Sequence, residues 1–186
     1  MRSFRLIALP FVAAFAFTFL VQAQQGKTEK ADKLAPYFPT PESIVDRMLQ
    51  LGELKAGEKM YDLGSGDGRI VIDAARKYKA NAVGVELDAS LVRQSSERIK
   101  TLKLTDLAHI VEGDLLKQDY SSADLLTVYL LPVATELVTP ILEKQLKPGS
   151  RIVAHDFQFA QWKPAKIVDI DDDGEGRAHR LYLYRR

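Results

Sequence analysis

A glycine-rich run and two acids stand where two expected strands end, and these residues are the best suited in the sequence to hold a ligand. Asp62 closes the expected strand Lys59–Leu63, and the run 64–68 leads from it into the expected helix Arg69–Tyr78. Glycine adopts positive φ and lets a ligand approach the backbone without a Cβ in the way. The helix that follows offers free N–H groups and the positive end of its dipole to an electron-rich group. Glu86 ends the next expected strand, about 20 residues beyond the first glycine, where an acid reaches ribose hydroxyls. The pattern therefore predicts a ligand that contains adenosine.

The spacing of the glycines decides between two such ligands. A dinucleotide fingerprint reads G-x-G-x-x-G and leaves room for a pyrophosphate, whereas this run reads G-x-G-x-G. Asp67 within the run would repel a pyrophosphate but tolerate a sulfonium or an ammonium group. These features argue against NAD and favour S-adenosylmethionine as the cofactor.

The segment resembles the first motif of the class I S-adenosylmethionine-dependent methyltransferases, an acid followed by G-x-G-x-G. The resemblance implies an α/β, Rossmann-like fold whose seven-stranded, mainly parallel sheet ends in a C-terminal antiparallel hairpin. It also implies that Glu86 holds the ribose hydroxyls, that Asp114 and Leu115 bracket the adenine, and that residues 129–132 border the transferring methyl group. The residues implied to line the methionine end of the cofactor are Asp62, Gly64, Ser65, Gly66, Asp67 and Gly68.

A narrower resemblance covers most of the chain. The sequence is similar to a small family of lysine methyltransferases whose eukaryotic members lie in mitochondria and modify membrane proteins of the energy machinery. This resemblance implies a protein substrate with an accessible lysine, on a membrane protein as one case, and a lid formed by Thr40 with Tyr37 over the cofactor. The segments that carry it are residues 36–41, 61–71, 83–88, 128–132 and 155–157.

A lysine acceptor sets a physical requirement on the site. With a pKa near 10.4, a neutral amine at pH 7 costs about 4.6 kcal/mol, and part of this must come from the site. Desolvation beside a sulfonium disfavours a second positive charge, and an aromatic wall such as Tyr129 or Phe157 can orient the amine. We expect Tyr129 and then His155 to be the catalytic-site residues, whereas His109 and His179 are expected to be structural or surface residues.

The elements that must position these residues alternate along the chain. Apolar runs alternate with amphipathic ones, which is typical of strands and crossover helices in a parallel sheet. The last two runs alternate around an Asp/Gly-rich turn at 171–176 and predict a β-hairpin. The expected helices are 43–51, Arg69–Tyr78, 90–102 and 133–146, and the expected strands are Lys59–Leu63, 82–87, 109–112, 125–131, Arg151–His155, Lys166–Ile170 and 180–184.

Composition excludes several classes of protein. The chain has 186 residues, which favours one domain, and its 46% hydrophobic and 27% charged residues are typical of a globular protein. A net charge of +1 provides no field for non-specific nucleic-acid binding, so no nucleic-acid partner is expected. With no cysteine and only three widely spaced histidines, no metal site is expected either. We expect a monomer or a weak oligomer.

The N-terminus has the pattern of a targeting segment. Two arginines precede an apolar run from Leu6 to Leu20, and small residues follow around Ala23. We expect a cleaved signal peptide over residues 1–23, a linker over 24–35 and the methyltransferase domain over 36–186. The enzyme would then be exported, to the periplasm or outside the cell. A retained membrane anchor is the alternative, although the apolar run is shorter than the roughly 20 residues that a span needs.

Three functions stay open at this point. The first is a methyltransferase acting on protein lysine, and the second keeps the enzyme but gives it a small-molecule acceptor. The third is a non-catalytic nucleoside-binding module outside the cytoplasm, because a secretory signal conflicts with a cofactor made in the cytosol.

Overall fold

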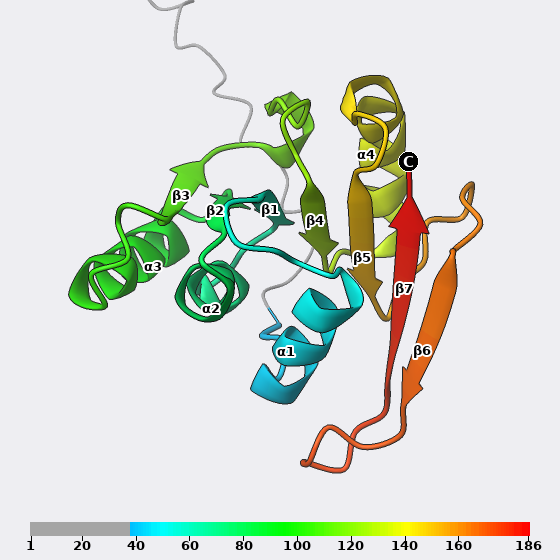
Figure 1. Cartoon of the computed structure of the whole chain (residues 1–186), viewed down its shortest axis with the longest axis horizontal. Helices are drawn as coiled ribbons and strands as arrows, with labels where there is room; N and C mark the ends of the chain where they lie inside the picture. Colours follow the sequence, from blue (N-terminus) through cyan, green and yellow to red (C-terminus); the bar gives the residue numbers. More distant parts are fainter. Residues whose placement is uncertain (1–37) are drawn as a thin grey trace, which may run out of the picture. The chain divides into compact units, whose positions relative to one another are not determined.

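A seven-stranded sheet lies at the centre of residues 38–186, the part of the chain that the computed structural model describes (Figure 1). Its strand order is β3-β2-β1-β4-β5-β7-β6; the first five strands pair in parallel, and β7 pairs antiparallel with both β5 and β6. The strands are β1 Lys59–Leu63, β2 Asn81–Glu86, β3 Ala108–Glu112, β4 Leu125–Val128, β5 Arg151–His155, β6 Lys166–Ile170 and β7 His179–Arg185. The predicted fold class is therefore confirmed.

Helices cover both faces of the sheet. In Figure 1, α1, α2 and α3 lie on one side of the strands and α4 on the other. The helices are α1 Glu42–Leu51, α2 Arg69–Tyr78, α3 Ala89–Thr101 and α4 Pro132–Gln145, with a short 3-10 turn η1 at Leu115–Lys117. Coverage of both faces explains why every residue of β4 and β5 is buried, including the polar residues Thr127, Arg151 and His155.

Alternation along each strand divides the buried side chains into two cores. In β7, Leu181 and Leu183 pack with α1 and α2, whereas Tyr182 and Tyr184 pack with α4. Successive side chains of a strand point to opposite faces, so β1, β2, β4, β5 and β7 each contribute to both cores. This rigid double-sided packing fixes the carboxyl ends of the parallel strands relative to one another, and those ends carry the predicted site residues.

The predicted elements differ from the observed ones mainly at their ends. The fourth strand was expected over 125–131, but β4 ends at Val128 and the chain turns at 129–131 into α4, which begins at Pro132. Proline suits the first turn of a helix, and its ring biases the preceding residue toward extended backbone. Tyr129 therefore lies just past the strand. The η1 turn was not predicted.

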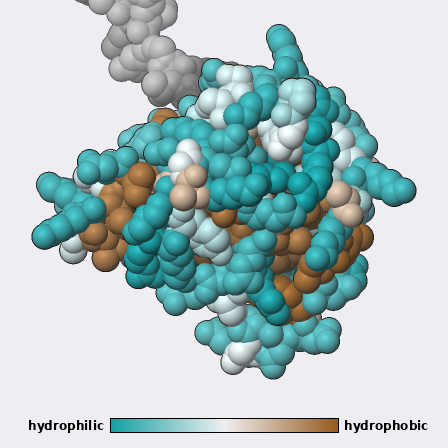
Figure 2. All heavy atoms as spheres, in the orientation of Figure 1, coloured by the Kyte–Doolittle hydropathy of each residue, from teal (hydrophilic) through white to brown (hydrophobic). Residues whose placement is uncertain are grey.

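The expected signal peptide, linker and Tyr37 lie outside the described residues. None of the helices within residues 38–186 has the length and apolar character that crossing a bilayer takes. Figure 2 shows a mostly hydrophilic face with separate hydrophobic groups.

Candidate active site

The glycine run forms a tight loop between β1 and α2. Gly64, Gly66 and Gly68 all have positive φ, at 76°, 54° and 75°, which a side chain would oppose. The loop is attached to β2, because the N–H groups of Gly64 and Ser65 both donate to the carbonyl of Val85, at 2.9 and 3.0 Å. Gly68 also allows close helix packing, since a Cβ there would lie 2.9 Å from Cβ of Ser95 in α3. The glycines are thus required by backbone geometry, and they leave Gly64 exposed at the carboxyl edge of the sheet.

Glu86 holds the same loop from the end of β2. Its Oε2 accepts a hydrogen bond from the Gly66 N–H at 2.9 Å, and its Oε1 accepts from the N–H groups of Leu87 and Asp88 at 2.9 and 2.8 Å. A carboxylate with three backbone donors is held firmly in one orientation. Glu86 therefore lies where the sequence placed it, and it also positions the loop.

Asp67 is paired within the protein. Its carboxylate accepts from Nε and NH2 of Arg69, at 3.0 and 2.8 Å, and lies 3.6 Å from NH1 of Arg98. Burial acts to raise the pKa of Asp67, but the hydrogen bonds and ion pair with Arg69 outweigh it and hold the pKa below its usual value. The charge of Asp67 is therefore matched by arginine, which weakens its expected part in rejecting a pyrophosphate. NH1 of Arg69 also donates to the carbonyl of Thr40 at 2.8 Å, which ties the segment before α1 to the glycine loop.

Asp62 is the buried acid of the site. It is 3% exposed, and its Oδ1 accepts a 2.7 Å hydrogen bond from the hydroxyl of Thr127 on the neighbouring strand β4. Burial raises the pKa of Asp62 to about 7; Glu86 and Asp67 add to the rise, and the Thr127 hydrogen bond opposes it. A carboxylate that is costly to ionise on its own is suited to a cationic ligand, which would favour its charged form.

Asp114 and Leu115 follow β3 at the same edge of the sheet. Oδ1 of Asp114 accepts from the N–H of Leu116 at 2.9 Å and so caps the η1 turn, and Oδ2 lies 3.6 Å from the ammonium of Lys117. Leu115 begins this turn. Capping places both residues at the carboxyl end of β3, and their predicted contact with an adenine stays a prediction.

Tyr129 and His155 meet at the ends of β4 and β5. Their ring centroids lie 4.0 Å apart, and the ring of Phe157 is stacked with that of Tyr129 at a centroid distance of 6.2 Å. Tyr129 is half-buried and His155 is fully buried. Burial lowers the pKa of His155 to about 4, with Asp156 opposing the shift, so the imidazole is neutral at pH 7. The structure thus brings the two predicted catalytic residues together.

His179 was expected to be a structural or surface residue, and the structure places it against His155. Nε2 of His155 lies 2.8 Å from Nδ1 of His179, the first residue of β7. Nε2 of His179 lies 3.1 Å from Oδ2 of Asp173 in the turn after β6, and Nδ1 of His155 lies 3.4 Å from Oγ1 of Thr40. No motif in the sequence marks His179, because only the pairing of β7 with β5 brings the two histidines together.

Asp156 completes this group. Its Oδ2 lies 3.5 Å from Nε2 of His155 and 3.4 Å from Nδ1 of His179, and it accepts a 3.4 Å hydrogen bond from the Tyr129 hydroxyl. Three such side chains can hold a metal ion, but here the imidazoles use the same two nitrogens to hydrogen-bond each other. NH2 of Arg177 also lies 3.7 Å from the Asp156 carboxylate. We therefore interpret the cluster as a hydrogen-bonded group.

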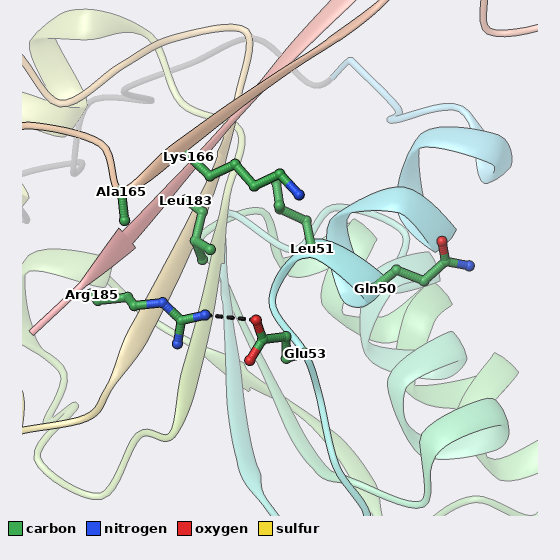
Figure 3. A pocket seen from close by; sticks show the side chains of 7 residues that line it. All are labelled: Gln50, Leu51, Glu53, Ala165, Lys166, Leu183 and Arg185. Atoms are coloured by element: carbon green, nitrogen blue, oxygen red, sulfur yellow. Dashed lines mark hydrogen bonds and ion pairs between the residues drawn. The ribbon is translucent and has the colours of Figure 1, made fainter.

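A shallow pocket of about 250 Å³ lies away from these residues (Figure 3). It lies between the end of α1 and the β6–β7 hairpin, and an ion pair of 2.7 Å between Arg185 and Glu53 crosses it. Arg185 pairs with Arg151, the first residue of β5, so the pocket faces the amino ends of the parallel strands. Ligands of such sheets bind at the carboxyl ends, and we assign no function to this pocket.

Comparisons with known proteins agree with this geometry. The ANTKMT methyltransferase domain matches residues 62–166. The chain is 40% identical over 150 residues to a protein-lysine N-methyltransferase of Saccharolobus islandicus, with 80% of this chain and 92% of that protein covered. This chain belongs to the ANTKMT methyltransferase family.

Two further relatives add detail. The chain is 32% identical to the adenine nucleotide translocase lysine N-methyltransferase of Mus musculus over 80% of its own length, but it spans only 62% of that protein. An RNA methyltransferase from Salinibacter ruber, solved in complex with S-adenosyl-L-homocysteine, has a TM-score of 0.74 and 42% identity, with 80% of this chain and 93% of that chain covered. The predictions of a class I methyltransferase and of S-adenosylmethionine as its cofactor are confirmed.

The residues of the site fit this cofactor. The exposed Gly64 presents bare backbone, and a Cβ at this position would come within 3.1 Å of Cδ2 of Leu130. Asp62 and Glu86 supply negative charge beside it, which complements the amino and sulfonium cations of S-adenosylmethionine. When bound, the cofactor supplies the methyl group, and we expect Asp62 and the glycine loop to hold its methionine end.

Glu86→Ala is expected to weaken S-adenosylmethionine binding by about 10- to 100-fold. The substitution removes the acceptor for Gly66 N–H as well as the acid predicted to hold the ribose, and hydrogen bonds to charged groups are worth about 1.5–3 kcal/mol. Calorimetric titration checks this. Glu112→Ala is the matched control, because Glu112 is the neighbour of Glu86 in the β2–β3 register but is exposed. Equal affinities for the two variants would contradict the role of Glu86.

Proposed function

We propose that the chain is a protein-lysine N-methyltransferase that uses S-adenosylmethionine. The observation that carries the proposal is the aromatic wall beside the cofactor loop, where the Tyr129 ring lies 4.0 Å from a neutral, buried His155 at the carboxyl edge of the sheet. The 40% identity with a protein-lysine N-methyltransferase supports it.

The chemistry of this edge suits an amine acceptor. The acceptor must be a neutral amine when it attacks. The half-buried Tyr129 ring and the neutral His155 imidazole beside it place no positive charge within this ring pair. Burial raises the pKa of Tyr129, so its phenol keeps its proton at pH 7. Its hydroxyl is fixed between two charged groups, because it donates to Asp156 at 3.4 Å and accepts from NH2 of Arg177 at 3.3 Å. A fixed ring can align the amine with the methyl group, and such alignment supplies much of the rate enhancement.

The experiment that tests the proposal is methyl transfer from S-adenosylmethionine labelled in its methyl group. The purified protein is incubated with poly-L-lysine, with poly-L-arginine and with total transfer RNA as separate acceptors. We expect label in poly-L-lysine alone, with mass spectrometry placing the added methyl on the side-chain nitrogen. Label in RNA alone would overturn the proposal and give this chain the acceptor class named for its Salinibacter ruber relative. Labelling of none of the three polymers, with cofactor binding intact, would favour a small-molecule acceptor.

A membrane-protein substrate and an exported or anchored enzyme are finer parts of the proposal. The mouse relative supports the membrane-protein substrate, because its name gives the adenine nucleotide translocase as the substrate of that enzyme. The targeting pattern of residues 1–23 supports the location. Fractionation of cells that express the full chain, followed by N-terminal sequencing, tests the location. A chain that stays in the cytosol with Met1 intact would contradict it. We propose that the enzyme acts as a monomer or a weak oligomer, which sedimentation analysis tests.

A further inference from the structure

A row of four polar groups leads from the segment before α1 to the tip of the β6–β7 hairpin. Its members are Thr40, His155, His179 and Asp173, and the successive distances are 3.4, 2.8 and 3.1 Å. Both imidazoles are fully buried, and the side chain of Asp173 is 2% exposed. In a buried row of hydrogen-bonded groups, each group that donates to one neighbour must accept from the next. The protonation state of the group at one end therefore fixes the direction of every hydrogen bond in the row.

The ionised end sets this order. The pKa of Asp173 lies below its usual value because the Glu175 N–H and then His179 donate to it, so Asp173 is a carboxylate at pH 7 and can only accept. His179 must therefore carry hydrogen on Nε2, and when neutral it accepts at Nδ1. Nε2 of His155 then donates to His179, and Nδ1 of His155 is left to accept from the Thr40 hydroxyl.

We propose that Thr40, His155 and His179 form a proton relay that takes the proton released during methyl transfer and holds it on His179. The inference rests on the proposed function, since methylation of a lysine ammonium releases one proton for each methyl group transferred. In the relay, Thr40 Oγ1 accepts a proton from the lysine ammonium, which leaves the neutral amine that attacks the methyl group, and passes its own proton to Nδ1 of His155. His155 passes its Nε2 proton to Nδ1 of His179. His155 ends neutral with its tautomer reversed, and His179 ends as an imidazolium.

The surroundings of the two histidines suit them to different roles in the relay, His155 to transferring the proton and His179 to holding it. Burial lowers the pKa of His155 to about 4, so its imidazolium form is unfavourable at pH 7. His155 can therefore transfer a proton by exchanging one tautomer for the other, without retaining the charge. A charge on His179 lies between two carboxylates, Asp173 at 3.1 Å and Asp156 at 3.4 Å. The described residues also place Tyr129 and Arg177 against this cluster. The Tyr129 ring lies 4.0 Å from that of His155, and Arg177 lies 3.7 Å from Asp156 and donates to the Tyr129 hydroxyl at 3.3 Å.

The hairpin tip is fixed firmly enough for this role. Oδ1 of Asp173 accepts from the N–H groups of Glu175 and Arg177, at 2.8 and 3.2 Å. Its carbonyl accepts a 2.8 Å hydrogen bond from the hydroxyl of Ser43 in α1. Asp173 and His179 do not need to touch the substrate; they act through His155 as positioning and proton-holding residues.

The test compares His179→Gln with the wild type across pH 7 to 9.5, with methyl transfer to poly-L-lysine as the readout. We expect kcat of the variant to fall by about 100-fold at pH 7, in the usual range for loss of proton transfer. The deficit should shrink to less than about fivefold at pH 9.5, because the acceptor then loses its proton to solvent. His109→Gln, a change of the same type at an exposed strand position, should leave kcat unchanged at every pH. A deficit that is constant across pH would show a merely structural role and overturn the relay.

A second measurement does not depend on the acceptor. Imidazole ¹⁵N spectra of the wild type should show His155 as the neutral tautomer with hydrogen on Nε2, and Asp173→Asn should abolish that preference. A His155 with hydrogen on Nδ1 in the wild type would overturn the relay, as would loss of wild-type activity on treatment with EDTA, which would assign the cluster to a metal. Failure of the wild type to methylate lysine at any pH would instead refute the proposed function, so the two failures are distinguishable.

Discussion

Asp62→Asn is expected to weaken S-adenosylmethionine binding by about 100-fold and, at the same time, to stabilise the cofactor-free fold at pH 8. The binding loss follows from removing the buried negative charge beside the glycine loop, and charge-assisted contacts are worth up to about 3 kcal/mol. The stability gain follows from the cost of that charge. Burial raises the pKa of Asp62 from 3.8 to about 7, and at about 1.4 kcal/mol per pKa unit its ionisation costs the fold about 4 kcal/mol.

The pH dependence follows from the direction of this shift. Because the pKa of Asp62 is higher in the folded state, the cost is absent below about pH 4, grows up to about pH 7 and is complete above it. Urea unfolding at pH 4 and pH 8 should therefore show a gain for Asp62→Asn only at pH 8. The Thr127 hydroxyl can still donate to the amide oxygen of the new side chain. Asp106→Asn, at an exposed acid, should change neither stability nor affinity. An Asp62→Asn protein that is less stable at pH 8, or that binds the cofactor as the wild type does, would contradict this account.

The geometry of the candidate cofactor site could be predicted because its determinants are local. The run from Asp62 to Gly68 comprises one strand end, one turn and one helix start. The positions of its three glycines in the sequence predict where the backbone adopts positive φ. Glu86 follows at the end of the next parallel strand, where sheet topology alone puts it beside the loop. The alternation of buried strands with amphipathic helices predicted the rest of the sheet for the same reason.

The acceptor side could be predicted only in part because its determinants are distant in sequence. Tyr129 and His155 follow adjacent parallel strands, so topology brings their rings together. His179 reaches His155 only through the antiparallel pairing of β7 with β5, and Asp173 reaches His179 only through the shape of the hairpin turn. No spacing rule encodes either contact. A lone histidine at the start of a strand carries no signal of its own, so its burial against His155 was not predicted.

Gly84→Ala is expected to weaken cofactor binding by about tenfold or more, although residue 84 lies within β2 and not in the loop. A Cβ at this position would lie 2.5 Å from Oγ and 2.6 Å from Cβ of Ser65. The loop has little freedom to retreat, since Ser65 N–H is bonded to the carbonyl of Val85 and Gly66 N–H to Glu86. Overpacking of this kind costs about 1–3 kcal/mol, so the variant should fold with a lower free energy of unfolding.

Rescue by a second substitution separates this mechanism from a general loss of stability. Ser65→Gly removes both Ser65 atoms that the new methyl group would meet, and the remaining close atom, Cδ1 of Ile110, is the flexible end of a side chain. The double variant should therefore bind S-adenosylmethionine more tightly than Gly84→Ala alone, even though Ser65→Gly by itself costs about 0.5–1 kcal/mol in chain entropy. Calorimetric titration of the two single variants and the double variant gives the coupling energy directly. Additive losses would mean that β2 and the loop are independent, whereas a favourable coupling would show that Gly84 shapes the cofactor site by making room for Ser65.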